Sequence, residues 1–379
     1  MKKIIQNIYR LIKYKEYRQA HFRNYKIKPD QNNLIKQIFT NTAEKLIVFL
    51  VPGADRLTGA ETVSGGVISI FSLCEETKSI YKNNINTAVI LCTINGDFLI
   101  SKYCNFENNT PVFRFEQISK FFNNVTHIIV HVPDYLTTHF YTTLTKKDLT
   151  FFKNLNVVHF NILNQNIILM PKPKDIIGLK TIGNLTTITS AHQQYCTQDM
   201  SNYYEVPIHK FSVWISPEKY EFKKWEEKEN IISFSPDTYI NKEKIEIELK
   251  NRFPEYSIVT ISNLTYSDYK KLILNSKFVI TFGEGLDAYF IEPIFSGSIS
   301  FAVYNEIFFT PEYKNLDNIF NSYEDLETNL LDKISQYDTP ASYKSVNSLA
   351  YNLCASHYSY NVYKKNIELF YEGKYTYNC

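Results

Sequence analysis

The chain alternates short, uninterrupted apolar runs with segments whose apolar residues recur at helical spacing. The run Lys45–Val51 is the first, and a run of this kind is typical of a strand buried on both faces of a parallel sheet. Between the runs, apolar residues three or four positions apart predict helices. The pattern predicts strands over 45–51, 88–94, 128–132, 155–160, 231–234, 256–261, 278–282 and 299–303. It predicts helices over 67–78, 135–144, 242–251, 267–275, 286–295, 323–334 and 342–370.

Strand and helix alternate in two separate series, which predicts an α/β protein with two Rossmann-like domains in tandem facing a cleft. A less regular stretch with four prolines, residues 170–228, separates the two series. The predicted parts are a basic N-terminal segment at 1–44, an acceptor domain at 45–208, a linker at 209–228, a nucleotide-sugar domain at 229–340 and a helical segment at 341–379. We expect the last segment to pack back toward the N-terminal domain.

Composition narrows the class of protein. A chain of 379 residues that is 44% hydrophobic is long enough for two domains with their own cores and is not mainly disordered. No apolar stretch reaches about 18 residues, so we expect no membrane-spanning helix. Six cysteines without metal-binding spacing predict reduced thiols in a cytoplasmic protein. The net charge of +2 argues against a general nucleic-acid binder.

The first 28 residues differ from the rest in charge. They hold nine Lys/Arg and one acid, so the remainder of the chain is net acidic. Ile4, Ile8 and Leu11 follow helical spacing among these charges. The segment therefore predicts an amphipathic helix on an anionic membrane surface, which would make the protein peripheral at the inner face of the membrane. A basic helix packed on the N-terminal domain by one face is the alternative.

Glycine is scarce and clustered. Of 11 glycines, seven fall in two segments, and they are Gly53, Gly59, Gly65, Gly66, Gly283, Gly285 and Gly297. Such clusters indicate loops where the backbone turns sharply or approaches a ligand, although two ordinary tight turns would also explain them. In the second cluster a buried strand ends at Gly283-Glu284-Gly285 and a helix begins, which favours an anion site. Glu292 lies about two helical turns after Glu284, so both carboxylates are expected to face one cleft.

The segment around Glu284 resembles the E-x7-E signature of retaining GT-B glycosyltransferases, notably glycosyltransferase family 4. In that family it reads roughly E-G-F-G-L-P-x-x-E-A-x-x-x-G-x-P-V. The chain keeps Glu284, Gly285, Glu292 and Gly297, and it differs at Asp287, Tyr289 and Ser298–Ile299. The resemblance implies that Glu284 is catalytic and contacts the transferring sugar. It also implies that Glu292 contacts the ribose or diphosphate, and that Gly283, Gly285 and Leu286 bind the donor.

Further parts of the chain resemble the same family. Gly65 and Gly66, followed by an apolar helix, are similar to the family's glycine loop, which implies donor binding. His131 resembles a histidine that the family often carries at the end of a central strand, which implies a catalytic contact with the sugar. A buried or surface histidine with satisfied hydrogen bonds is the alternative. Residues 233–242 stand where the family has a basic residue for the diphosphate, which implies Ser235 and Lys242 as donor-binding residues, although no arginine is present there.

The sequence contains no Asp-x-Asp, the diphosphate–metal motif of GT-A enzymes. We therefore predict no metal and no cofactor, with a nucleotide-sugar as co-substrate. The predicted function is transfer of a sugar to a surface-glycan or lipid-linked acceptor, with retention, and no nucleic-acid partner. Two alternatives remain open. One is a catalytically inactive GT-B-like subunit or glycan-binding partner, and the other is a sugar-nucleotide epimerase of GT-B architecture.

Overall fold

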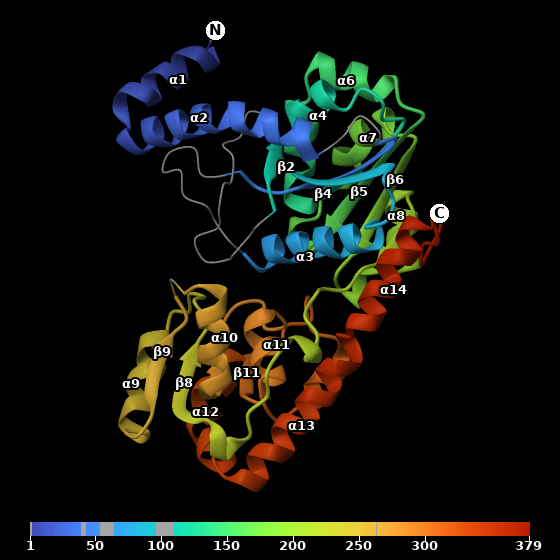
Figure 1. The fold of residues 1–379 in the computed structure, drawn as a ribbon. Coiled ribbons are helices and arrows are strands. Elements are labelled where there is room, and N and C mark those ends of the chain that lie inside the picture. The colour runs from blue at the N-terminus through green and yellow to red at the C-terminus, as the bar shows by residue number, and fades with distance from the viewer. Residues whose placement is uncertain (1, 39–42, 54–63, 96–109, 263) are drawn as a thin grey trace. The chain divides into compact units, whose positions relative to one another are not determined.

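A computed structural model describes residues 2–38, 43–53, 64–95, 110–262 and 264–379, so Gly59 of the first glycine cluster lies outside the described residues. The chain forms two compact units (Figure 1). Unit 1 comprises Met1–Ser212 together with Lys364–Cys379, and unit 2 comprises Val213–Tyr363. The first passage between the units, at Ser212–Val213, lies inside the range predicted as linker.

Unit 1 is built on a seven-stranded parallel sheet with the strand order β3-β2-β1-β4-β5-β6-β7. The strands are β1 (Lys45–Leu50), β2 (Thr87–Thr93), β3 (Val112–Arg114), β4 (His127–Pro133), β5 (Val157–Asn164), β6 (Leu185–Ser190) and β7 (Ile208–Lys210). Every β1 residue after Lys45 is buried, as expected for a central strand that pairs with β2 and β4. The apolar runs therefore predicted β1, β2, β4 and β5 at the centre of this sheet, while β6 and the three-residue strands β3 and β7 were not predicted.

The helices of unit 1 are α1 (Lys2–Lys13), α2 (Lys15–Ile38), α3 (Gly65–Ile80), α4 (Ile118–Phe121), α5 (Thr137–Thr143), α6 (Lys146–Lys153), α7 (Pro173–Ile182) and α8 (Gln198–Tyr204). The last helix, α14 (Tyr360–Tyr371), begins in unit 2 and ends in unit 1. In unit 1 its residues Phe370 and Tyr371 pack against β4 and β5.

The N-terminal segment is more helical than the sequence suggests. The sequence predicted a helix only within the first 28 residues, but α2 continues through Pro29 to Ile38. Packing explains the extension, because Ile35 is buried in the core of unit 1 and Leu34 packs against it. Gln117 Nε2 also donates a hydrogen bond of 2.7 Å to Asn32 Oδ1. These contacts attach the end of α2 to the unit and outweigh its polar composition.

Unit 2 is built on a five-stranded parallel sheet with the strand order β12-β11-β10-β8-β9. Its strands are β8 (Glu229–Phe234), β9 (Ser257–Thr260), β10 (Ser276–Ile280), β11 (Ile299–Val303) and β12 (Ile319–Phe320). Its helices are α9 (Lys242–Arg252), α10 (Tyr266–Asn275), α11 (Ala288–Phe295), α12 (Tyr323–Tyr337) and α13 (Pro340–His357). The central strand β10 is buried along its whole length, as the apolar run predicted.

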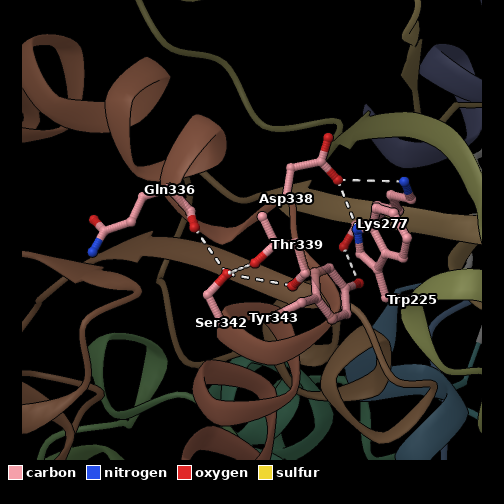
Figure 2. A network of polar contacts seen from close by, with 7 residues as sticks. All are labelled: Trp225, Lys277, Gln336, Asp338, Thr339, Ser342 and Tyr343. Atoms are coloured by element: carbon pink, nitrogen blue, oxygen red, sulfur yellow. Dashed lines mark hydrogen bonds and ion pairs between the residues drawn. The ribbon is translucent and has the colours of Figure 1, made fainter.

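A polar network fixes the start of β10 (Figure 2). The Lys277 ammonium lies 3.3 Å from Asp338 Oδ1 and 3.9 Å from the ring centroid of Trp225, whose Nε1 donates to the same carboxylate at 2.7 Å. Tyr343 donates a hydrogen bond to the Lys277 carbonyl. Asp338 and Tyr343 flank the connection between α12 and α13, so the network ties that connection to the amino end of the strand. The candidate site lies at the opposite end of this strand, where the carboxyl ends of the parallel strands meet.

None of the helices in the described ranges is both long and apolar enough to cross a bilayer.

Candidate active site

The connection between β10 and α11 is held by its own backbone and capping contacts. Asp287 caps α11, and its Oδ1 accepts a hydrogen bond of 3.1 Å from the Phe290 amide. The helix therefore begins at Ala288, two residues after the predicted start at Leu286. Leu286 itself is buried in the core of unit 2. Leu286, which was predicted to bind the donor, thus anchors the turn, while Glu284, which was predicted to be catalytic, remains partly exposed.

The glycines of the turn are required by its geometry. Gly285 has a φ of 86°, and a Cβ there would lie 2.4 Å from the Phe309 ring and 3.0 Å from the Val303 carbonyl oxygen. Gly297, after α11, has a φ of 88°, and its Cβ would lie 2.2 Å from the Lys223 carbonyl oxygen. Both positions lie in the left-handed region, which disfavours any residue with a side chain. This sequence of turn, helix and turn therefore depends on glycine.

Ser235 and Lys242, both predicted donor-binding residues, lie beside this turn. Ser235 follows β8 and is fully buried, and its Oγ accepts a hydrogen bond of 3.2 Å from the Phe282 amide. The Lys242 ammonium donates to the carbonyl oxygens of Ser235 and Asp237 at 2.5 and 3.0 Å. Partial burial lowers the Lys242 pKa, although the Asp237 carboxylate opposes the shift. Lys242 is thus the basic side chain that the structure places next to the glycine turn.

Three carboxylates surround the turn. The Asp237 carboxyl carbon would lie 2.8 Å from a Cβ on Gly283, and its buried Oδ2 has no hydrogen-bond partner among the described residues. Burial, followed by the charges of Asp237 and Glu284, raises the Asp287 pKa to about 8. Asp287 is therefore largely neutral at pH 7, which reduces the negative charge of this edge. Asp237 was not singled out from the sequence, although it follows the end of β8 as Glu284 follows β10.

Glu292 lies among tyrosines of unit 2. Its side chain is 1% exposed, and Tyr266 donates a hydrogen bond of 3.4 Å to Oε2. Tyr220 lies 3.3 Å from the Tyr266 hydroxyl. Burial raises the Glu292 pKa to about 8, although hydrogen bonds from Tyr220 and Tyr266 act to lower it. The carboxyl is therefore largely protonated at pH 7. The structure therefore places Glu284 at a partly exposed edge and Glu292 in the interior, whereas the helical spacing suggested two carboxylates facing one cleft.

In unit 1, Gly65 and Gly66 form the first turn of α3, which Ser64 caps by accepting a 3.4 Å hydrogen bond from the Val67 amide. Gln165, just after β5, donates a 2.9 Å hydrogen bond to the Gly66 carbonyl. The backbone of Gln165 in turn donates to Asp134 Oδ2 at 2.9 Å. The glycine pair is therefore joined to the carboxyl ends of β4 and β5, which is the edge where open α/β sheets bind ligands.

His131 lies inside unit 1. It is fully buried, its ring stacks on Phe49 at 4.3 Å, and its Nδ1 and Nε2 lie 2.9 Å from Asn161 Nδ2 and 3.0 Å from the Tyr371 hydroxyl. Burial, with a smaller contribution from His159, lowers the His131 pKa well below its ordinary value. The geometry favours the alternative of a buried histidine with satisfied hydrogen bonds. The catalytic contact implied by the family resemblance stays a prediction.

The structure thus brings Ser235, Lys242, Gly283, Glu284 and Gly285 together at one edge of the unit 2 sheet. Among the described residues, no group of three or more His, Cys, Asp or Glu side chains is arranged to hold a metal ion. The sequence signal that could have added Asp237 is its position directly after a buried strand. The tyrosines around Glu292 carry no comparable signal, because Tyr is abundant along the whole chain.

Comparison with known proteins identifies the fold. No protein-family model matches the chain. No curated protein matches it either. Among solved structures, a putative UDP-N-acetylglucosamine 2-epimerase from Listeria monocytogenes aligns with a TM-score of 0.50 and 9% identity, over 87% of this chain and 97% of that one. A UDP-GlcNAc 2-epimerase from Neisseria meningitidis gives a TM-score of 0.48 and 11% identity, over 86% and 99% of the two chains.

An α,α-trehalose-phosphate synthase from Burkholderia xenovorans gives a TM-score of 0.47 and 9% identity, over 87% of this chain and all of that one. At such low identity, the likeness to the Listeria protein shows the fold alone. It confirms the predicted fold class, a GT-B-like pair of parallel α/β domains. Membership of glycosyltransferase family 4 stays a prediction.

Proposed function

We propose that the protein is a glycosyltransferase that moves a sugar, with retention, from a nucleotide-sugar to a surface-glycan or lipid-linked acceptor. The observation that carries the proposal is Glu284, a partly exposed carboxylate in a glycine turn at the carboxyl end of a central strand. The donor binds mainly to unit 2 and the acceptor mainly to unit 1. Glu284 contacts the transferring sugar, and Glu292 supports the ribose or diphosphate side.

The charges around the turn fit an anionic donor. Asp287 and Glu292 both have a pKa raised to about 8, so each is largely neutral at pH 7 and repels a diphosphate little. The Lys242 ammonium lies beside the turn and supplies positive charge. The amides at the start of α11 add the partial positive charge of a helix N-terminus. His131 carries no step in this proposal, because both of its ring nitrogens have partners inside unit 1.

We propose that the reaction needs no metal or cofactor, because these groups supply the stabilisation of a leaving diphosphate. Turnover in excess EDTA should equal turnover in its absence. Loss of activity with EDTA that Mn²⁺ or Mg²⁺ restores would contradict this part of the proposal.

The acidic groups also favour a second candidate, a sugar-nucleotide epimerase. Epimerisation by proton transfer needs a side chain that gives and takes a proton near neutral pH, and a carboxyl such as Asp287, with a pKa of about 8, suits that task. A catalytically inactive glycan-binding subunit is the third candidate, because the chain departs from the family pattern at Asp287 and has no arginine within residues 233–242.

One experiment separates the three candidates. The purified protein is incubated in D₂O with a panel of nucleotide-sugars, and NMR follows the sugar carbon 2 and the release of nucleotide. A transferase releases nucleotide, faster with acceptor, and leaves the carbon-2 proton unexchanged. An epimerase incorporates deuterium at carbon 2 without acceptor. An inactive subunit does neither, even where a thermal shift shows binding.

A further inference from the structure

Helix α1 has an apolar face that unit 1 does not cover. Five large side chains lie along one side of this 12-residue helix, and all are at least half exposed: Ile4, Ile5, Ile8, Tyr9 and Ile12. Ile12 is the most exposed of them, at 73%. At 100° per residue these positions fill one continuous arc, while Gln6, Arg10 and Lys13 fill the opposite arc.

The edge of α1 that contacts α2 is a different one. Leu11 and Tyr14 pack around the buried Tyr17, and the Tyr17 hydroxyl donates to Asn7 Oδ1 at 3.3 Å. Arg18 donates to the carbonyl oxygens of Leu11 and Ile12 at 3.0 and 2.7 Å, so it also caps the end of α1. The helix pair is shown in Figure 1. The contact with α2 therefore fixes α1 by its edge and leaves the isoleucine face open.

Charge indicates what covers this face. The sequence of α1 carries four Lys/Arg and no acid, and residues 1–28 as a whole carry nine basic residues against one acidic. A second copy of the chain would bring an equally basic helix against it, so like charges would oppose that pairing. An anionic bilayer attracts the basic arc and accepts the apolar arc among its acyl chains.

We propose that α1 is a membrane-insertion helix that lies in the surface of an anionic bilayer with its isoleucine face buried in the acyl region. Attachment then depends mainly on the isoleucine face, and the basic residues select an anionic surface. The sequence predicted an amphipathic helix on an anionic membrane surface within residues 1–28, with Ile4, Ile8 and Leu11 on its apolar side. In the structure Leu11 packs around Tyr17 instead, and Ile5, Tyr9 and Ile12 join Ile4 and Ile8 on the exposed face. The proposal does not depend on the reaction that the protein performs.

The test uses the full chain and vesicles of equal parts phosphatidylcholine and phosphatidylglycerol. Ile8→Glu should lower the vesicle partition coefficient about tenfold or more, because a charged group replaces an inserted apolar one. Ile177→Glu is the matched control, since Ile177 is also a helical isoleucine of unit 1 and is 57% exposed, against 51% for Ile8. The control should bind vesicles as the unaltered protein does. Equal binding of Ile8→Glu and the unaltered protein would overturn the proposal.

Two further measurements separate insertion from other occupants of the face. In Ile8→Trp, the introduced tryptophan adds its fluorescence to that of Trp214 and Trp225. Lipids brominated in their acyl chains should quench this added fluorescence. Absence of that quenching in vesicle-bound protein would mean surface adsorption and would overturn insertion. Light scattering without vesicles should give the same mass for Ile8→Glu and the unaltered protein. A dimer that Ile8→Glu converts to a monomer would instead show that a second copy covers the face.

Discussion

The two glycine turns differ in the role that their geometry gives to glycine. In unit 1, Gly65 and Gly66 form the first turn of α3, whereas in unit 2 Gly283 and Gly285 precede α11, and each helix follows a buried strand. In unit 2, Gly285 has a positive φ and no space for a Cβ. In unit 1, Gly65 is not among the residues with positive φ, and a Cβ on it would meet no described atom within 4 Å. The turn in unit 2 therefore needs glycine for its backbone, whereas the position of Gly65 in unit 1 could accept a side chain as far as the described residues are concerned.

The buried polar side chains of the two units also differ in how far their hydrogen bonds are satisfied. In unit 1, His131 and Asn161 satisfy each other and the Tyr371 hydroxyl, so this cluster holds the sheet and the end of α14 together. In unit 2, Asp237 keeps a buried oxygen without a partner among the described residues, and the Asp287 and Glu292 pKa values are raised. Unmet polar groups and perturbed carboxyls are more typical of functional sites than of structural ones. Unit 1 also has such groups near its glycine pair, because the buried side chain of Asn164 has no hydrogen-bond partner among the described residues and burial raises the Asp134 pKa. What distinguishes unit 2 is a pair of carboxyls whose pKa values are raised to about 8, and this favours unit 2 as the location of the chemistry.

The largest expected effect is that of Gly285→Ala. The substitution forces a side chain into the left-handed region and against the Phe309 ring, so it should lower the free energy of unfolding by about 1–3 kcal/mol. Urea unfolding monitored by circular dichroism measures the change. A loss below about 0.5 kcal/mol would show that the turn relaxes easily and that the contrast between the glycine turns is wrong.

The sequence predicted the parts of the fold that depend on local pattern. The strands at Lys45–Leu50 and Ser276–Ile280 are central, buried on both faces and uninterrupted, so their apolar runs identified them within two residues. The end of α2 was missed because its contacts with the core come from two adjacent apolar residues, Leu34 and Ile35, in a largely polar segment without helical periodicity. The three-residue strands β3 and β7 were missed because pairing with neighbours defines them, and short strands leave no periodic signal. The six-residue strand β6 was missed because threonines and a serine interrupt its apolar residues.

The candidate site was predictable where position along a strand fixes it. Gly283 and Glu284 were identified because they follow the end of a buried strand, whereas Lys242 was implied by the resemblance to glycosyltransferase family 4. The burial of Glu292 was not predictable, because it depends on Tyr220 and Tyr266, which come from other elements. The partners of His131 were hidden for the same reason, since Tyr371 lies 240 residues further along the chain.

The second expected effect is on catalysis. Glu284→Gln should keep the fold and lower turnover at saturating donor at least about tenfold, which corresponds to about 1.4 kcal/mol of barrier. Glu229→Gln is the control, because Glu229 is exposed at the other end of the same sheet. Its turnover should match that of the unaltered protein. Unchanged turnover in Glu284→Gln would remove Glu284 from the mechanism and weaken the assignment of chemistry to unit 2.

The third effect is on the pH dependence of stability. The Glu292 pKa is raised from 4.5 to about 8, so between these values the folded protein holds a proton that the unfolded chain has released. Stability from this group is therefore present at low pH and is lost as the pH rises toward 8. Glu292→Gln lacks the titration, so its stability relative to the unaltered protein should increase by about 1 kcal/mol or more between about pH 5 and pH 8.

Thermal unfolding of the two proteins at each pH measures that difference. Other buried groups, such as His131 and Lys228, titrate in both proteins and cancel in the comparison. A constant difference across the range would mean that Glu292 is ionised in the folded protein. The contrast between a satisfied cluster in unit 1 and a perturbed one in unit 2 would then rest on Asp287 alone.

The smallest expected effect on stability is that of Gly65→Ala. Alanine in the first turn of α3 meets no described atom within 4 Å and requires no positive φ, so the free energy of unfolding should change by about 0.5 kcal/mol or less.

The added methyl group should matter only when a ligand lies next to it. If the donor phosphates approach this turn, the added methyl group weakens donor binding, which a thermal-shift titration with nucleotide-sugar measures. A loss of stability comparable to that of Gly285→Ala would show instead that both turns need glycine for their backbone, and the difference between the two units would disappear.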